Sequence, residues 1–338
     1  MKKILVAMSG GVDSTAAAIV LKNQGFEVAG STMLLRDGGE KDVEDARAAA
    51  EKIGIPFYAM DFRKEFYENV ITPFMEVYEA GETPNPCVVC NRTMKFGLFL
   101  DKALEMGFDA MATGHYSKIE EQNGRYFLRM ARDLAKDQTY MLCGLSQFQL
   151  AHTVFPLGEI EDKDHTRAIV QRMGLPRKHD SQDICFVPDG DYLAYLREHG
   201  VTPKPGNFVS PEGKVYGPHR GMEAYTIGQR RGLGLAFGER AYVLGKRGTD
   251  IVLGEEKELY SDTVQVVNVN YQPIEKPEGP MRVRARLRYT TKLYDATLIP
   301  EEWGCTLKFD APQRAVTPGQ TAAFYEGDRL LGGGTIKK

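Results

Sequence analysis

The feature that most constrains the fold is a glycine turn close to the start of the chain. An apolar run, ILVA, leads through Met8 into SGGVDS at residues 9–14, and an alanine-rich stretch follows. Paired glycines permit positive φ angles, which let successive backbone N–H groups converge on an anion in front of a helix N-terminus. The pattern therefore predicts a strand, a phosphate-binding loop and a helix, in this order.

The loop differs from the common Walker A loop in its charged residues. It lacks the lysine that reaches the β- and γ-phosphates, and it carries a carboxylate, Asp13. A carboxylate beside phosphates is favourable mainly when Mg²⁺ lies between them. A loop that holds pyrophosphate without activating the γ-phosphate suits cleavage between the α- and β-phosphates of ATP. A purely structural turn is the alternative.

The pattern of apolar residues differs between the first and the second part of the chain. Up to about residue 201, short apolar runs alternate with helical stretches, which is typical of a doubly wound α/β sheet that binds ligands at the carboxyl ends of its strands. From residue 202, Gly and Pro become frequent and short strands replace the helices, as in small β-barrels. We expect an ATP-binding domain over 1–201, a central β-rich domain over 202–262 and a C-terminal β-barrel over 263–338.

The composition limits the class of protein and of partner. The chain has 338 residues, of which 42% are hydrophobic and 26% charged, as in globular proteins with sizeable cores. A net charge of −3 gives no global attraction to nucleic acid, so any RNA would be recognised by a local basic surface. No apolar run approaches the roughly 20 residues of a membrane-spanning helix. We expect a cytoplasmic protein with no membrane partner.

The settings of the five cysteines matter more than their number, because an odd count does not indicate a disulfide scaffold. Cys87 and Cys90 form a CxxC pair, which suits a redox dithiol, a metal or cluster site, or simple packing. We expect Cys90 to lie just before a helix, where the dipole stabilises a thiolate. Cys185 lies in SQDICF, whereas Cys143 and Cys305 lie in apolar runs and are expected to be inert.

A basic alternation near residue 285 is a candidate RNA surface. In MRVRARLRYTTK, arginines recur with period two at Arg282, Arg284, Arg286 and Arg288. On a strand all four point to one face, which could follow a phosphate backbone. A solvated strand face without a ligand is the alternative.

Six motifs along the chain together resemble one family. MSGGVDS, TPNPCVVCN, ATGHY, KDQTYML, SQDICF and IGQRRGLG occur in this order, as in the tRNA-specific 2-thiouridylases of the PP-loop ATP pyrophosphatase superfamily. The resemblance covers nearly the whole chain. It implies an ATP-dependent sulfurtransferase that adenylates the C2 oxygen of the wobble uridine in tRNAs for Lys, Glu and Gln. It also implies ATP and Mg²⁺ as cofactors, and a cysteine desulfurase or sulfur-relay protein as sulfur donor.

The resemblance also implies roles for particular residues. Cys90 matches the family's nucleophile, and Cys185 matches the cysteine that accepts persulfide sulfur. The nucleotide-binding positions match Ala7, Met8, Ser9, Gly10, Gly11, Val12, Asp13, Ser14, Met33 and Gly114. Contacts to the target base match Asn85, Pro86 and Cys87, and contacts to tRNA match Lys136, Asp137, Gln138, Arg288 and Tyr289.

One position departs from the family pattern. Many relatives carry Asp three residues before the nucleophile as a proposed general base, and this chain has Cys87 there. Cys87, Cys90 and Cys185 form a three-thiolate set of the kind that holds a [4Fe-4S] cluster with one open iron in related thiolases. Cluster-dependent sulfur transfer, a persulfide and disulfide cycle, and a zinc or structural role are the three alternatives.

Two other function classes share part of the pattern. An ATP-pyrophosphatase amidoligase that acts on a small molecule would have the same loop, but would give no reason for the cysteines or the arginine strand. An RNA-binding module with a vestigial nucleotide site would give no reason for the intact loop.

Overall fold

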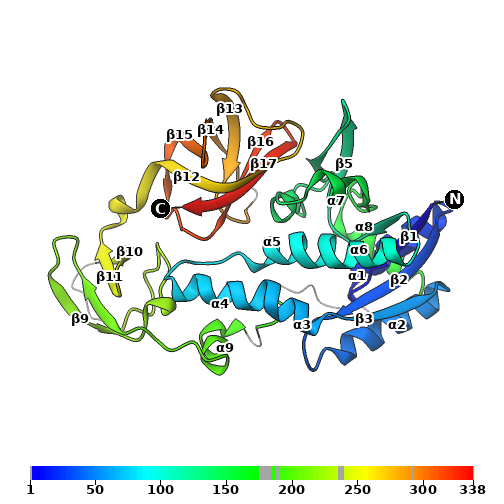
Figure 1. The fold of residues 1–338 in the computed structure, drawn as a ribbon, viewed down its shortest axis with the longest axis horizontal. Helices are drawn as coiled ribbons and strands as arrows, with labels where there is room; N and C mark the ends of the chain where they lie inside the picture. The colour runs from blue at the N-terminus through cyan, green and yellow to red at the C-terminus, as the bar shows by residue number, and fades with distance from the viewer. Residues whose placement is uncertain (1, 175–183, 188–189, 235–239, 291, 338) are drawn as a thin grey trace.

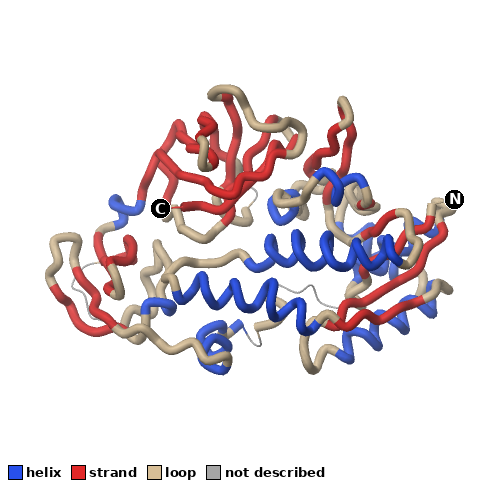
Figure 2. Tube along the Cα trace, in the orientation of Figure 1, coloured by secondary structure: helices blue, strands red, loops and turns tan. Residues whose placement is uncertain are grey.

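The computed structural model describes residues 2–174, 184–187, 190–234, 240–290 and 292–337 of the chain. A parallel sheet with its helices forms the N-terminal part, and a barrel and a smaller sheet form the C-terminal part (Figures 1 and 2). Two long helical segments run from the parallel sheet toward the smaller sheet, beneath the barrel in this view. In the described part of the chain, no helix is long and apolar enough to cross a membrane.

The N-terminal sheet is doubly wound, as predicted. Its strand order is β3-β2-β1-β4-β7 and every pairing is parallel. Ile4 and Val6 pack with α1, α2 and α8, whereas Leu5 packs with α6 on the opposite face. The strands are β1 (Lys3–Ala7), β2 (Glu27–Leu34), β3 (Phe57–Asp61), β4 (Ala110–Ala112) and β7 (Thr153–Val154), and the helices are α1 (Val12–Asn23), α2 (Glu40–Ile53), α6 (Phe99–Glu105) and α8 (Lys163–Gln171).

The two long helical segments each combine α- and π-helical turns. The second begins at Pro86, earlier than the expected start after Asn91, because Asn85 caps it and accepts a hydrogen bond from the Val88 N–H at 3.4 Å. Cys90 therefore lies one turn inside the helix, which corrects the predicted place before its N-terminus. The segments are α3 (Arg63–Phe66), η1 (Tyr67–Ile71) and α4 (Thr72–Glu79), then α5 (Pro86–Cys90), η2 (Asn91–Leu98) and α6.

The C-terminal half forms two β structures, as predicted from its short apolar runs and its frequent Gly and Pro. The smaller sheet follows α9 (Tyr192–Glu198) and consists of β8 (Gly206–Val209), β9 (Val215–His219), β10 (Tyr242–Arg247) and β11 (Asp250–Gly254). Pairing of the first and last strands closes the barrel. Its strands are β12 (Tyr260–Tyr271), β13 (Met281–Arg286), β14 (Tyr294–Glu301), β15 (Gly304–Arg314), β16 (Thr321–Glu326) and β17 (Arg329–Lys337).

A hairpin that the sequence analysis missed connects the two halves. β5 (Ser117–Gln122) and β6 (Arg125–Met130) leave the N-terminal half and extend the sheet of the barrel, with Arg129 of β6 paired to Arg329 of β17. The apolar core continues across this contact, because Leu128 packs in the same cluster as Leu330 of the barrel. The parallel sheet and one side of the barrel therefore share an apolar cluster, whereas the interior of the barrel forms a cluster of its own.

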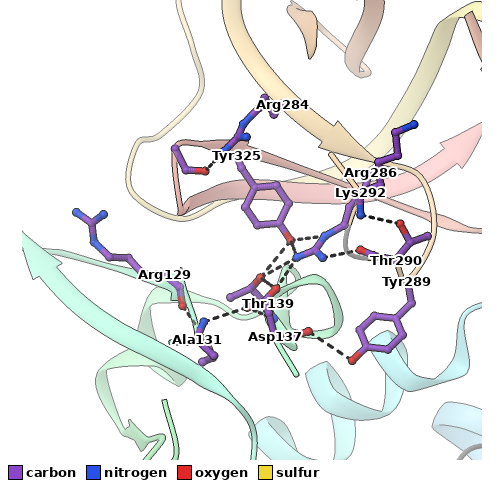
Figure 3. A network of polar contacts seen from close by, with 12 residues as sticks. Arg129, Ala131, Asp137, Thr139, Arg284, Arg286, Tyr289, Thr290, Lys292 and Tyr325 are labelled. Atoms are coloured by element: carbon purple, nitrogen blue, oxygen red, sulfur yellow. Dashed lines mark hydrogen bonds and ion pairs between the residues drawn. The ribbon is translucent and has the colours of Figure 1, made fainter. Parts of the chain in front are cut away.

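A buried ion pair accompanies this shared cluster (Figure 3). Arg286 of β13 is 3% exposed and Asp137, in the segment after β6, is 4% exposed. The guanidinium donates to the Asp137 carboxylate at 2.5 Å, to the Tyr325 hydroxyl at 2.7 Å and to the Thr290 carbonyl at 2.7 Å. Each charged group thus has partners that compensate for its loss of water.

The predicted four-arginine RNA face is wrong in part. Arg282 and Arg284 are exposed, as alternation predicts, but Arg282 pairs with Asp310 at 2.6 Å and Arg284 donates to the Gly327 carbonyl. Arg286 belongs to the same face by alternation, yet the segment around Asp137 covers it. The strand also ends at Arg286, so Arg288 lies beyond it.

Replacing Arg286 by Met is expected to lower the free energy of unfolding by about 3–5 kcal/mol, because Asp137 would keep a buried, unpaired charge. The denaturant midpoint measures this loss. Arg282→Met on the same strand is the control and should hardly change the midpoint, because solvent screens its exposed ion pair. Equal midpoints for the two variants would contradict the role of the buried pair.

Candidate active site

The glycine loop has the predicted strand–loop–helix geometry. Gly10 has φ 70°, in the left-handed region, and Gly11 is the N-cap of α1. The Ser9 N–H donates to the Ser14 hydroxyl at 3.1 Å, and the Ser14 hydroxyl donates to the Gly11 carbonyl at 3.2 Å. These bonds fold the loop over the start of a helix of 12 residues, where an anion is favoured.

A second loop meets the glycine loop at Gly114, just after β4. A Cβ on Gly114 would lie 2.6 Å from the Asp13 carbonyl carbon and the Ser14 nitrogen, so only glycine fits. The loops after β1 and β4 thus meet where the strand order reverses, the usual ligand-binding place in such sheets. Met33 lies half-buried near the carboxyl end of the adjacent β2. The other predicted nucleotide residues line the same edge: Ala7 ends β1, Met8 follows it, and Val12 begins α1.

The carboxylate of Asp13 has protein partners. Lys163 of α8 is 8% exposed and its ammonium lies 2.7 and 2.6 Å from the two carboxylate oxygens. The Tyr116 hydroxyl donates to the same carboxylate at 2.8 Å. The sequence suggested only Mg²⁺ as a partner of the Asp13 carboxylate. Lys163 was missed because it lies 150 positions away and belongs to no motif near the loop.

The three predicted reactive cysteines lie near one another, because Cys90 packs in the same apolar cluster as Ile184 and Phe186, the two neighbours of Cys185. Cys90 is 8% exposed, and burial raises the pKa of its thiol to about 11; Lys95 opposes this shift, and Cys185 and Cys87 add to it. Burial by its surroundings also raises the pKa of Cys87, although part of its side chain is exposed. Cys185 is exposed. The expected dipole-stabilised thiolate at Cys90 is therefore wrong, because desolvation dominates.

Lys95 is a site residue that sequence analysis missed. Its positive charge lowers the pKa of Cys90, Cys87 and His115, so it lies among all three. Residues five apart diverge on an α-helix, but the i→i+5 pattern of the π-helical segment η2 brings Lys95 to the Cys90 side. Because His115 directly follows Gly114, Lys95 connects the thiols to the edge that carries the glycine loop.

His115 is held neutral at this edge. Burial, with a smaller contribution from Lys95, holds its pKa well below the ordinary value, and its Nδ1 lies 2.7 Å from the Thr113 hydroxyl. Phe96 and Phe155 pack against its ring. A neutral imidazole fits a structural or hydrogen-bonding role better than that of a cation.

A metal site at the thiols would need several ligand side chains that converge on one point. Within the described ranges, no group of three or more His, Cys, Asp or Glu side chains is arranged to hold a metal ion. The expected [4Fe-4S] ligand set, Cys87, Cys90 and Cys185, gains no support from this arrangement. Residues 181–183 of the SQDICF motif lie outside the described residues.

The cysteines expected to be inert are buried. Cys143 is 1% exposed and Cys305 0% exposed, and burial raises the pKa of both to about 12. Both pack in apolar clusters, which agrees with the expected core role.

The structure brings together the two sets of predicted tRNA contacts. Tyr289 is 50% exposed and its hydroxyl donates to the Asp137 carbonyl at 3.4 Å; Arg288 beside it is exposed and donates to the Arg314 carbonyl at 3.1 Å. Gln138 accepts from the Tyr116 N–H at 3.0 Å, and Lys136 is half-exposed. The Asp137 carboxylate, in contrast, is buried against Arg286, so a contact of this residue with tRNA would have to use its backbone.

The predicted base-contact residues lie at the start of the second long helical segment. Asn85 caps the helix and donates to the Thr321 hydroxyl of the barrel at 3.3 Å; Pro86 is buried at the first helical position. Cys87 is the exposed member of the three.

Comparison with known proteins assigns the family. Three family models match in order: a tRNA methyl transferase HUP domain over 2–189, a tRNA methyl transferase PRC-barrel domain over 194–252 and an aminomethyltransferase beta-barrel domain over 261–336. The tRNA-specific 2-thiouridylase MnmA of Desulfitobacterium hafniense is 46% identical, over 99% of this chain and 98% of its own. The chain belongs to the tRNA-specific 2-thiouridylase family.

A second relative and a solved structure are also similar to this chain. The 2-thiouridylase MnmA of Clostridium acetobutylicum is also 46% identical, over 99% of both chains. A crystal structure of a 4-thiouridine synthetase with RNA and ATP shares 15% identity, covers 58% of this chain and 50% of its own, and has a TM-score of 0.35. The family assignment rests on the sequence relatives, because so low a TM-score supports no argument.

The alkylation rate of Cys90 by iodoacetamide is expected to rise about tenfold per pH unit from pH 7 to 10, without a plateau. The raised pKa keeps the thiol neutral in this range, so the thiolate fraction grows in proportion to hydroxide. Peptide-resolved mass spectrometry measures the rate. A plateau below pH 9 would show that burial does not raise the pKa.

Replacing Lys95 by Met is expected to slow alkylation of Cys90 at pH 8 by about three- to tenfold, because loss of the nearby positive charge raises the thiol pKa further. Lys102→Met removes the same charge from an exposed position on α6 and is the control. If both variants react at the wild-type rate, Lys95 does not act on the thiol.

Proposed function

We propose that this protein catalyses ATP-dependent 2-thiolation of the wobble uridine in tRNAs for Lys, Glu and Gln. The observation that carries the proposal is the proximity of two kinds of chemistry. A pyrophosphate-type loop meets Gly114, and the next residue, His115, packs against the ring of Phe96, which lies on the same helical segment as Cys87 and Cys90. An adenylating site and a sulfur site therefore adjoin. An amidoligase would need the first site but not the second.

The loop's part in the reaction is to hold the pyrophosphate that leaves. Backbone N–H groups at the start of α1 and the hydroxyls of Ser9 and Ser14 suit an anion there. The C2 oxygen of uridine attacks the α-phosphate, pyrophosphate departs, and the oxygen becomes part of a good leaving group, AMP. Lys163 already engages Asp13, so Mg²⁺ accompanying ATP would bind mainly through phosphate oxygens.

Sulfur then replaces the activated oxygen through the two thiols. A cysteine desulfurase or relay protein would load exposed Cys185 with a persulfide. Its terminal sulfur attacks C2 and expels AMP. Cys90 then attacks the Cys185 sulfur, so that a Cys90–Cys185 disulfide forms and the transferred sulfur stays on C2 as the thiocarbonyl. An external thiol reductant restores the two cysteines.

In the second sulfur route, Cys87, Cys90 and Cys185 would together hold a [4Fe-4S] cluster that supplies the sulfur. Iron content and the visible spectrum of anaerobically purified protein distinguish the routes. Active, iron-free protein would exclude the cluster, and activity strictly proportional to iron content would exclude the disulfide cycle. The cluster route is favoured by Cys87, which supplies a third thiolate where many relatives carry Asp.

RNA would lie across the surface shared by the barrel and the segment 136–138. The exposed ring of Tyr289 suits stacking of an unpaired anticodon base, and Arg288 suits a phosphate. We further propose that residues 1–201 carry the chemistry, and that the domains over 202–262 and 263–338 position the tRNA in the cytoplasm.

Replacing Cys90 or Cys185 by Ser is expected to lower thiolation at least about a thousandfold. Pyrophosphate release with tRNA should continue for about one turnover, because adenylation does not use the thiols. Mass analysis of tRNA nucleosides and single-turnover pyrophosphate assays measure the two steps. Cys305→Ser, in the barrel core, is the control. Retained thiolation in either active-site variant would overturn the proposed sulfur route.

Replacing Arg288 by Ala is expected to weaken tRNA binding and to reduce the slope of log K against log salt by about one unit, because one phosphate contact is lost. Binding titrations at several salt concentrations measure the slope. Lys102→Ala, an exposed change on α6, should leave it unchanged. A wild-type slope in the Arg288 variant would remove this residue from the RNA surface.

A further inference from the structure

We infer that Tyr116 is a positioning residue that joins the nucleotide loop to the RNA-facing segment 136–139, and that Arg286 of the barrel anchors the far end of this connection. The inference rests on the proposed function, since it assigns one end to ATP and the other to tRNA. It is carried by a continuous series of hydrogen bonds between parts of the chain that are distant in sequence.

The nucleotide end of the series is a buried cluster around Asp13. The Tyr116 side chain is 2% exposed, and its hydroxyl lies 2.8 Å from the Asp13 carboxylate and 2.9 Å from the Thr166 hydroxyl of α8. Lys163 of the same helix pairs with Asp13. The backbone of Asp13 in turn touches Gly114, two residues before Tyr116. Any displacement of Tyr116 therefore changes the position of the loop that would hold pyrophosphate.

The middle of the series is a two-way contact between Tyr116 and Gln138. The Tyr116 N–H donates to the Gln138 side-chain oxygen at 3.0 Å, and the Gln138 N–H donates to the Tyr116 carbonyl at 3.0 Å. Two reciprocal bonds fix both the distance and the orientation of the two segments. Gln138 is thus held by the same residue that holds Asp13.

The barrel end of the series fixes the residue next to Gln138. The Asp137 carboxylate accepts hydrogen bonds from Arg286, from the Thr139 hydroxyl and from the Ala131 N–H. The Asp137 carbonyl accepts from the hydroxyl of Tyr289, whose ring is half-exposed (Figure 3). A base stacked on Tyr289 would therefore bear on a segment that is rigidly bonded to Tyr116.

The consequence is a coupling of the two ligands. If tRNA restrains the segment 136–139, it also restrains Tyr116 and the loop around Asp13. ATP then binds a loop that is already ordered, so its binding costs less conformational entropy. Coupling of this kind is reciprocal: tRNA tightens ATP binding by the factor by which ATP tightens tRNA binding. Tyr116 touches neither ligand in this scheme and acts through Asp13 and Gln138.

The test measures the dissociation constant of ATP in the absence and presence of saturating tRNA, with the full chain. The wild-type protein is expected to bind ATP at least about fivefold more tightly with tRNA. Tyr116→Phe removes only the hydroxyl and should reduce this ratio by about threefold or more. A merely structural role of Tyr116 would change the ATP affinity equally with and without tRNA, and such a change cancels in the ratio.

Two further variants complete the design. Tyr126→Phe makes the same change in the hairpin, where the hydroxyl faces Glu121 near the tip, and should keep the wild-type ratio. Arg286→Lys keeps the charge but not the forked geometry, and should reduce the ratio as Tyr116→Phe does, although Arg286 lies in the barrel. Thermal melts before titration identify variants that fail to fold.

The outcomes separate the inference from the proposed function. A wild-type ratio near one, or an unchanged ratio in a folded Tyr116→Phe protein, would overturn the inference. The proposed function would still hold in that case if the wild-type protein forms AMP in the presence of tRNA. If the wild-type protein neither binds tRNA nor forms AMP with it, the proposed function fails, and the inference fails with it.

Discussion

A buried ion pair between Arg286 of the barrel and Asp137 of the N-terminal half fixes how the two halves of this molecule meet. Both side chains have left water almost completely, so each depends on the other and on Tyr325, Thr139 and Thr290 for compensation. The same contact carries a shared apolar cluster and an extended sheet. An interface of this kind does not behave as a flexible link between independent domains. It also sets the position of the segment 136–139.

The chemistry of the candidate site depends on a balance between burial and charge. Burial disfavours the Cys90 thiolate, and Lys95 only partly offsets this effect. In the proposed reaction, burial would also shield a sulfur intermediate from water and stray oxidants, so low intrinsic reactivity would suit a thiol that acts only after an activated uridine has arrived. The exposed Cys185 is in the better position to meet a sulfur donor. The two thiols are thus divided by environment into a protected and an accessible partner.

Much of the fold was predictable because its signals are local. Glycines in SGGVDS identify a loop between β1 and α1, and alternating strands and helices identify the parallel sheet. The hairpin of β5 and β6 was missed because its strands pair with a barrel whose last strand lies about two hundred residues later. Lys95 was missed because its approach to Cys90 depends on a π-helical turn, which has no recognisable periodicity in the sequence. The four arginines were assigned to one exposed face because alternation does not reveal what covers a strand.

The sequence by itself determined the family, the phosphate loop and the presence of three cysteines in distinctive motifs, because these depend on residue identity and short-range spacing. Only the tertiary structure decided which charges are buried and what they face. Asp13 lies against Lys163, Arg286 lies against Asp137, and Cys90 lies within a helix in an apolar cluster. Electrostatic free energy depends on distance and on solvent exposure, and both are set by contacts between segments far apart in the chain.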